Sequence, residues 1–104
     1  MESSKVDIKR IGLIDDGVIG FEMTLGPSWI NFGLSNNLFS ISMIGTTDKE
    51  RHKGYATHIL DTFVRMVKRK GGVIKVDAYT SSGEIYIHHV IEKLAKNYGV
   101  RIIQ

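Results

Sequence analysis

The spacing of apolar residues changes once along this chain of 104 residues, close to residue 50. Before that point, short apolar stretches are separated by residues that favour tight turns. After it, apolar residues recur every three or four positions in two segments, as they do on one face of an α-helix. The change of period therefore predicts a set of strands followed by helices that alternate with further strands.

Four strands are expected in the first half. Turn-forming groups separate them: Asp15-Asp16-Gly17, Gly26-Pro27 and Ser35-Asn36-Asn37. Each group is short enough to reverse the chain directly, so neighbouring strands should pair antiparallel. The predicted strands are Lys5–Ile14, Val18–Leu25, Trp29–Leu34 and Leu38–Ile44.

Two helices and two strands are expected in the second half. The stretch Tyr55–Lys70 carries one apolar face, made of Ala56, Ile59, Leu60, Phe63 and Val67, and Gly71-Gly72 ends it. Ser81 with Glu84 forms a capping-box pattern before a second apolar stripe of Ile87, Val90, Ile91, Leu94, Ala95 and Tyr98. Strands are predicted at Val73–Ala78 and Val100–Ile103. The expected fold is a single α+β domain over residues 1–104, in the order ββββαβαβ, with a mixed, mostly antiparallel six-stranded sheet and two helices.

Composition excludes several classes of site. The chain has no cysteine, so disulfides and thiolate metal sites are ruled out. The adjacent pair His88-His89 points in two directions on a helix, and no metal site is predicted. No apolar run approaches the roughly 18 residues of a membrane span, and the polar N-terminal residues lack a signal-peptide core. We expect a cytoplasmic protein without a membrane partner.

A basic turn with a glycine, Arg51-His52-Lys53-Gly54-Tyr55-Ala56, joins a predicted strand to a predicted helix. Glycine allows a close backbone approach to an anion, and the first N–H groups of the helix point toward it. Residues 48–75 contain eight Lys or Arg and three Asp or Glu, whereas the remainder contains six and eight. Cations beside a helix N-terminus are unfavourable unless an anion joins them, so Arg51 and Lys53 indicate a phosphorylated ligand.

The spacing Arg-x-x-Gly-x-Ala resembles the acetyl-CoA pyrophosphate loop of the GNAT superfamily of N-acetyltransferases, Arg/Gln-x-x-Gly-x-Gly/Ala. The order of elements is also similar, with some specificity over residues 38–104 and only by topology over 5–37. The resemblance implies a minimal member that lacks the first strand of the family and the two helices after it. The final-helix motif departs from the family pattern, because the tyrosine position falls on Ile91.

The resemblance implies acetyl-CoA as co-substrate and an amine as acceptor. Backbone N–H groups of the turn would bind the pyrophosphate, and the end of the fourth strand would pair with the pantetheine arm. The two parallel strands, Leu38–Ile44 and Val73–Ala78, would splay to admit that arm. The implied cofactor-binding residues are Met43, Ile44, Gly45, Thr46, Arg51, His52, Lys53, Gly54, Tyr55, Ala56 and Thr57.

Acetyl transfer requires a deprotonated amine and a proton for the departing thiolate. The strand Leu38–Ile44 contains no carboxylate, so Glu22 and Asp77 are the candidates for the base. Tyr86 is the first candidate for the acid, with Tyr79 and Tyr98 as alternatives. Protein lysine, N-terminal amine and small-molecule amine all remain open as acceptors.

Two other functions are consistent with the sequence. The first is a non-catalytic module of GNAT fold that binds CoA or a protein partner. The second is a small basic nucleic-acid-binding protein, which is disfavoured because only Tyr55 and Phe63 are aromatic within the basic region. A homodimer is also compatible with the chain, through an edge strand or through a sheet face left uncovered by the missing helices.

Overall fold

The computed structural model describes residues 6–15, 17–46, 54–76 and 84–103. It confirms the predicted α+β class, with a six-stranded mixed sheet and two helices. The elements are β1 (Asp7–Asp15), β2 (Val18–Leu25), β3 (Ser28–Ser35), β4 (Leu38–Thr46), α1 (Tyr55–Lys70), β5 (Val73–Val76), α2 (Glu84–Tyr98) and β6 (Arg101–Ile103).

The observed boundaries differ from the predicted ones mainly at strand ends. The bounds of α1 are those predicted, and β3 is one residue longer at each end. β1 ends one residue later than predicted, at Asp15, and begins at Asp7, because Val6 is not part of the strand. β4 continues two residues further, to Thr46, and β6 begins at Arg101 instead of Val100. β1 extends to Asp15 and β3 begins at Ser28 because pairing with β2 holds Asp15 opposite Val18 and Ser28 opposite Leu25. Lys5 and Asp77 lie outside the described residues.

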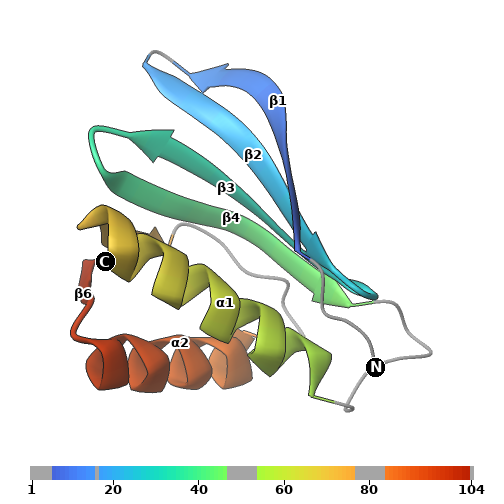
Figure 1. Ribbon diagram of the computed structural model, residues 1–104, viewed down its shortest axis with the longest axis vertical. Coiled ribbons are helices and arrows are strands. Elements are labelled where there is room, and N and C mark those ends of the chain that lie inside the picture. The colour runs from blue at the N-terminus through green and yellow to red at the C-terminus, as the bar shows by residue number, and fades with distance from the viewer. Residues whose placement is uncertain (1–5, 16, 47–53, 77–83, 104) are drawn as a thin grey trace.

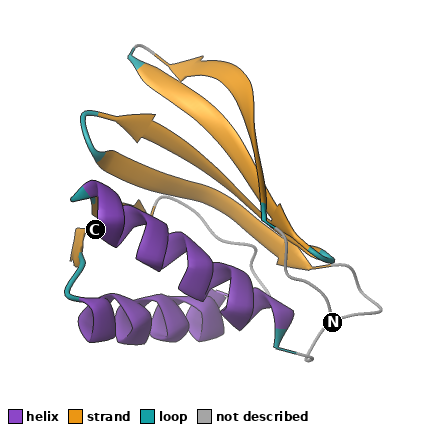
Figure 2. Ribbon diagram, viewed as in Figure 1, coloured by secondary structure: helices purple, strands orange, loops and turns teal. Residues whose placement is uncertain are grey.

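The strands follow one another across the sheet in sequence order, from β1 to β6. β1 to β4 form an antiparallel meander, and β4, β5 and β6 are parallel. Each parallel step needs a crossover, and α1 and α2 supply the two crossovers. Both helices lie on the same side of the sheet, which we call the helical face (Figure 1). Within the described ranges no helix lies on the opposite side, which we call the open face (Figure 2).

The turn between β3 and β4 shows how the register is set. Asn36 and Asn37 both have positive φ, 50° and 68°, the combination that a two-residue type I′ hairpin requires. Asparagine tolerates this region better than most residues do. The turn places Ser35 opposite Leu38 and Leu34 opposite Phe39, so the apolar side chains of both strands face the same way.

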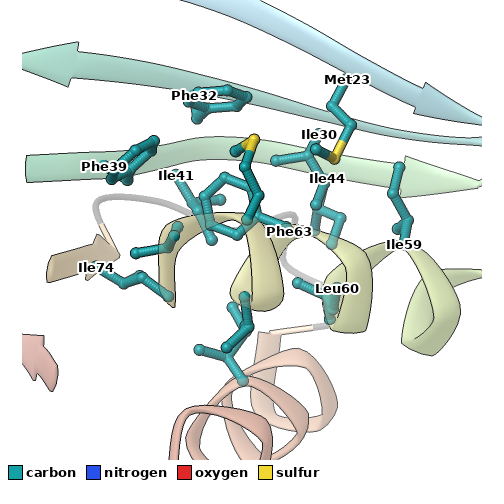
Figure 3. Packing of buried hydrophobic residues seen from close by; sticks show 14 of the residues in the cluster. Met23, Ile30, Phe32, Phe39, Ile41, Ile44, Ile59, Leu60, Phe63 and Ile74 are labelled. Carbon is teal, nitrogen blue, oxygen red and sulfur yellow. The ribbon is translucent and has the colours of Figure 1, made fainter. Parts of the chain in front are cut away.

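The core lies between α1 and the helical face. Phe63 of α1 is fully buried and meets Phe32 of β3 with ring centroids 5.1 Å apart, in an edge-to-face arrangement. Figure 3 shows Phe63 directed toward the strands, with Ile30, Phe32 and Ile44 above it. Val64 and Met66, outside the predicted stripe of α1, are buried as well. α1 buries this wider face because it contacts both the sheet and α2.

A polar contact joins the two helices. The hydroxyl of Tyr98 donates to Asp61 Oδ1 at 2.6 Å, and Arg65 Nε lies 3.1 Å from Asp61 Oδ2. The hydrogen bond to the carboxylate, followed by desolvation, raises the pKa of Tyr98 above its ordinary value of 10.0. This tyrosine therefore keeps its proton at neutral pH and belongs to the contact between α1 and α2.

Candidate functional site

The first part of the candidate site is the end of β4. The pairing of β4 with β3 contains a bulge, because Asn31 opposes Met43 while Phe32 opposes Ile41, which leaves Ser42 as the extra residue. The Ser42 hydroxyl donates to the backbone oxygen of Asn31 at 3.1 Å. A bulge bends the strand and redirects the residues that follow it. The segment after Ile41 therefore leaves the line of the first half of β4.

The described pairing of β4 with β5 ends at the same point of β4. Described pairs between the two parallel strands run from Leu38 and Val73 to Ile41 and Val76. β4 continues to Thr46 along β3, while the described part of β5 stops at Val76. Among the described residues, the last five positions of β4 therefore have a strand neighbour on the β3 side only. Whether the strands splay beyond Val76, as predicted, concerns residues outside the described ranges.

The second part of the site is the start of α1. Its N-cap is Gly54, with φ 84° and ψ 3°, and the ladder begins with the His58 N–H donating to the Gly54 oxygen at 3.0 Å. No side chain caps this helix end by a hydrogen bond in the described structure, and no acidic residue lies in the first turn. The usual N-cap supplies an oxygen for these N–H groups, and a glycine cannot. This helix start combines the positive end of the dipole with a cap that lacks a side chain.

Within the described part of the chain, the space around Gly54 is open. A methyl group added to its Cα would have no described heavy atom within 4 Å, apart from its chain neighbours. The positive φ is a second reason for glycine here, which the sequence alone did not reveal. The backbone conformation thus excludes most side chains, and the surroundings leave room for a ligand atom to approach.

The start of α1 and the end of β4 belong to the same end of the sheet. A methyl group on Gly26, in the β2–β3 turn, would lie 3.8 Å from Tyr55 Cε1. That turn is closed by Ser28, which pairs with Thr46 at the end of β4. Tyr55 is therefore positioned against the turn beside which β4 ends.

Trp29 covers Gly45 on the open face. The two residues are paired across β3 and β4, and a methyl group on Gly45 would lie 2.4 Å from Trp29 Cζ2. No larger residue fits at Gly45 unless the indole ring moves. The indole therefore lies over the backbone of the segment predicted to bind the pantetheine arm.

The candidate base Glu22 lies on β2, on the open face. It pairs with Asn31 of β3, which in turn pairs with Met43 of β4. Adjacent strands are about 4.8 Å apart, which places the Glu22 backbone roughly 10 Å from that of Met43. Glu22 therefore shares the open face with Trp29 and Met43 but lies two strands away from the predicted path of the arm.

The described residues of the predicted cofactor site lie in two places, at the end of β4 and at the start of α1. Met43, Ile44 and Gly45 lie along the end of β4, Ile44 with its side chain in the core. Gly54, Tyr55 and Thr57 lie at the start of α1. The structure does not describe Arg51, His52, Lys53, Asp77 or Tyr79. It describes the backbone, but not the side chain, of Thr46, Ala56 and Tyr86. Among the alternatives for the acid, Tyr98 is engaged with Asp61.

The sequence placed the acceptor region within Trp29–Asn37 but singled out neither Trp29 nor Asn31 as a candidate site residue. Asn31 lies one strand away from the segment Met43–Thr46, and its side-chain oxygen Oδ1 is buried and accepts no hydrogen bond from the described residues. The available signal was an asparagine between the apolar residues Ile30 and Phe32. Asparagine is depleted in strands, so its presence there was informative.

Other classes of site find no support in the described part of the chain. No group of three or more His, Cys, Asp or Glu is placed to hold a metal ion there. None of the described helices has the length and hydropathy to cross a membrane. The basic residues Lys68, Arg69 and Lys70 lie in the last turn of α1, where they complement the negative end of the helix dipole.

Comparison with known proteins gives no assignment: no family model matches the sequence, and neither a curated protein nor a solved structure matches the chain.

Proposed function

We propose that this protein is a minimal N-acetyltransferase of the GNAT type, which transfers an acetyl group from acetyl-CoA to an amine. One arrangement carries the proposal: β4 is bent by a bulge before its end, and the helix that follows β4 in the chain has as its N-cap an αL glycine that no described atom crowds. A phosphate group is favoured at such a helix end. The resemblance to the family adds the expectation that an extended amide-bearing chain pairs with the end of β4.

The residues at hand fit the parts of acetyl-CoA. Gly54 and the N–H groups that follow it would face the pyrophosphate, together with Arg51, His52 and Lys53 from the preceding turn. The backbone of Met43 to Thr46 would pair with the pantetheine amides. Trp29 would lie over this segment, because its ring already covers Gly45.

The reaction forms one bond and breaks one. The amine nitrogen attacks the thioester carbonyl carbon, a tetrahedral intermediate forms, and the carbon–sulfur bond then breaks. The nitrogen loses a proton to a base, for which Glu22 and Asp77 are the candidates, and the thiolate gains a proton, for which Tyr86 is the candidate. The products are an N-acetylated amine and CoA with a free thiol.

The test of this proposal is thiol release. Incubation with acetyl-CoA and a panel of amines (a lysine-containing peptide, a peptide with a free N-terminus and small alkylamines) should release CoA thiol in step with the acetylated product. Tyr86→Phe should lower turnover by roughly 10²-fold with CoA affinity nearly unchanged. Binding of acetyl-CoA without transfer to any amine would contradict the catalytic proposal and favour a non-catalytic CoA-binding module.

A further inference from the structure

Asn31 carries an unpartnered acceptor beside the candidate site. Its Oδ1 atom is buried and receives no hydrogen bond from any residue that the structure describes. A buried polar atom without a partner is destabilising, and such atoms are rare in folded proteins. Because Ile30 and Phe32 on either side point into the core, the Asn31 side chain belongs to the open face.

A carboxylate lies beside Asn31 on the open face. Glu22 is its partner on β2 and Met43 its partner on β4. Side chains of residues paired in this way start about 5 Å apart, so the Glu22 carboxylate lies within reach of the Asn31 amide. An amide oxygen and a carboxylate are both acceptors, and the ligand group that satisfies both is a cation with N–H donors.

We propose that Asn31 and Glu22 form a subsite for a primary ammonium group, with Asn31 Oδ1 and the Glu22 carboxylate accepting its N–H bonds. Its identification as the acceptor-amine subsite rests on the proposed function. The subsite lies one strand from Met43, the first residue of the segment assigned to the pantetheine arm, so an amine held there is next to that arm. Asn31 is thus a residue that orients the amine.

Access to Oδ1 restricts the class of amine. The atom is covered, whereas the Met43 side chain beside it is 46% exposed. Methionine is unbranched and flexible, so it can move aside for a slender group. A quaternary ammonium has no N–H to donate and is wider, and a neutral alcohol carries no charge for Glu22. The subsite therefore favours primary aliphatic amines over both.

The test is a titration without acetyl-CoA. Trp29, the only tryptophan in the sequence, is two residues from Asn31 on the same face, and its fluorescence reports binding there. Titrants are n-butylammonium, tetramethylammonium and n-butanol at constant ionic strength. Wild type should respond to n-butylammonium alone. Asn31→Leu should weaken that binding at least tenfold, while Ser40→Ala, on the same face of β4, should leave it unchanged.

The stability of the Asn31→Leu variant provides an independent test of the subsite. Leucine resembles asparagine in shape but has no polar atom to bury, so Asn31→Leu should raise the urea midpoint while it removes amine binding. A lower midpoint would show that Asn31 is held by contacts within the protein and would overturn the proposal. Equal n-butylammonium binding by wild type and Asn31→Leu, or none by wild type, would overturn it as well.

The experiments distinguish failure of the ammonium subsite from failure of the transferase proposal. If n-butylammonium binds through Asn31 but acetyl-CoA does not bind, the subsite stands as a cation site and the transferase proposal fails. If amines are acetylated while Asn31→Leu leaves the amine KM unchanged, the transferase stands and the subsite fails. In an active enzyme, the subsite requires that Asn31→Leu raise the amine KM at least tenfold with the KM for acetyl-CoA unchanged.

Discussion

Replacing Phe63 by alanine should remove about 3–5 kcal/mol from the free energy of unfolding. Phe63 is fully buried, and its ring meets Phe32 at 5.1 Å and Phe39 at 6.1 Å between centroids. The truncation removes a contact of α1 with two strands at once and leaves a cavity that rigid neighbours cannot fill. Domains of this size have a total stability of about 5–15 kcal/mol, so the variant should be partly unfolded near body temperature.

Urea denaturation measures this loss directly. Arg69→Ala, on the exposed side of the same helix, is the matched control and should change stability by less than about 0.5 kcal/mol. A loss below about 1 kcal/mol for Phe63→Ala would mean that α1 does not pack on the sheet through this ring. The slope of the transition should stay constant, because both variants unfold the same surface.

Replacing Gly54 by alanine should weaken acetyl-CoA binding at least tenfold, which corresponds to about 1.4 kcal/mol. The added methyl group points into the open space that the proposal assigns to the pyrophosphate, and φ of 84° is unfavourable for alanine. Binding should be measured by calorimetry at a temperature where the variant is folded.

Gly71→Ala is the control for backbone strain. Gly71 caps the opposite end of α1, with φ 68° and with no described atom within 4 Å of an added methyl group, apart from its chain neighbours. Both substitutions force alanine into the left-handed region, so each should cost about 1–2 kcal/mol of stability. Only the Gly54 variant should lose affinity for acetyl-CoA. Equal affinities of the two variants would place the pyrophosphate elsewhere.

The elements predicted best from the sequence are those that a local pattern of residues determines. α1 was bounded correctly because its apolar stripe, Ala56 to Val67, spans about three turns and Gly71 ends the helix in the left-handed conformation. The hairpin at Asn36-Asn37 was recognised from its composition, since few residues accept positive φ at two successive positions. These features depend on neighbours in the chain, and no knowledge of the tertiary structure is needed.

Other features depend on how elements meet. Val64 and Met66 are buried because α2 covers the side of α1 that an isolated surface helix exposes. Conversely, Ile8 and Leu13 point to the helical face but are 48% and 72% exposed, because β1 lies at the edge of the sheet beyond the helices. The bulge at Ser42 leaves no mark on the apolar pattern, since it depends on the register with β3.

The candidate site was predicted in part for the same reason. Gly54 stood out because a glycine in a basic turn before a helix is a local pattern. Asn31 did not stand out as a site residue, because its significance comes from Glu22 and Met43 on the neighbouring strands. Such cross-strand neighbours are known only when the register is known.

The most direct test of the central claim is a map of backbone amides perturbed by acetyl-CoA, obtained by two-dimensional ¹H–¹⁵N NMR. The account predicts the largest shifts at Gly45, Gly54 and Tyr55, at the end of β4 and the start of α1. Amides of β1 should not shift. Shifts confined to Lys68–Lys70, at the other end of α1, would show an anion bound by basic side chains alone. That result, or no shift at all, would contradict the account.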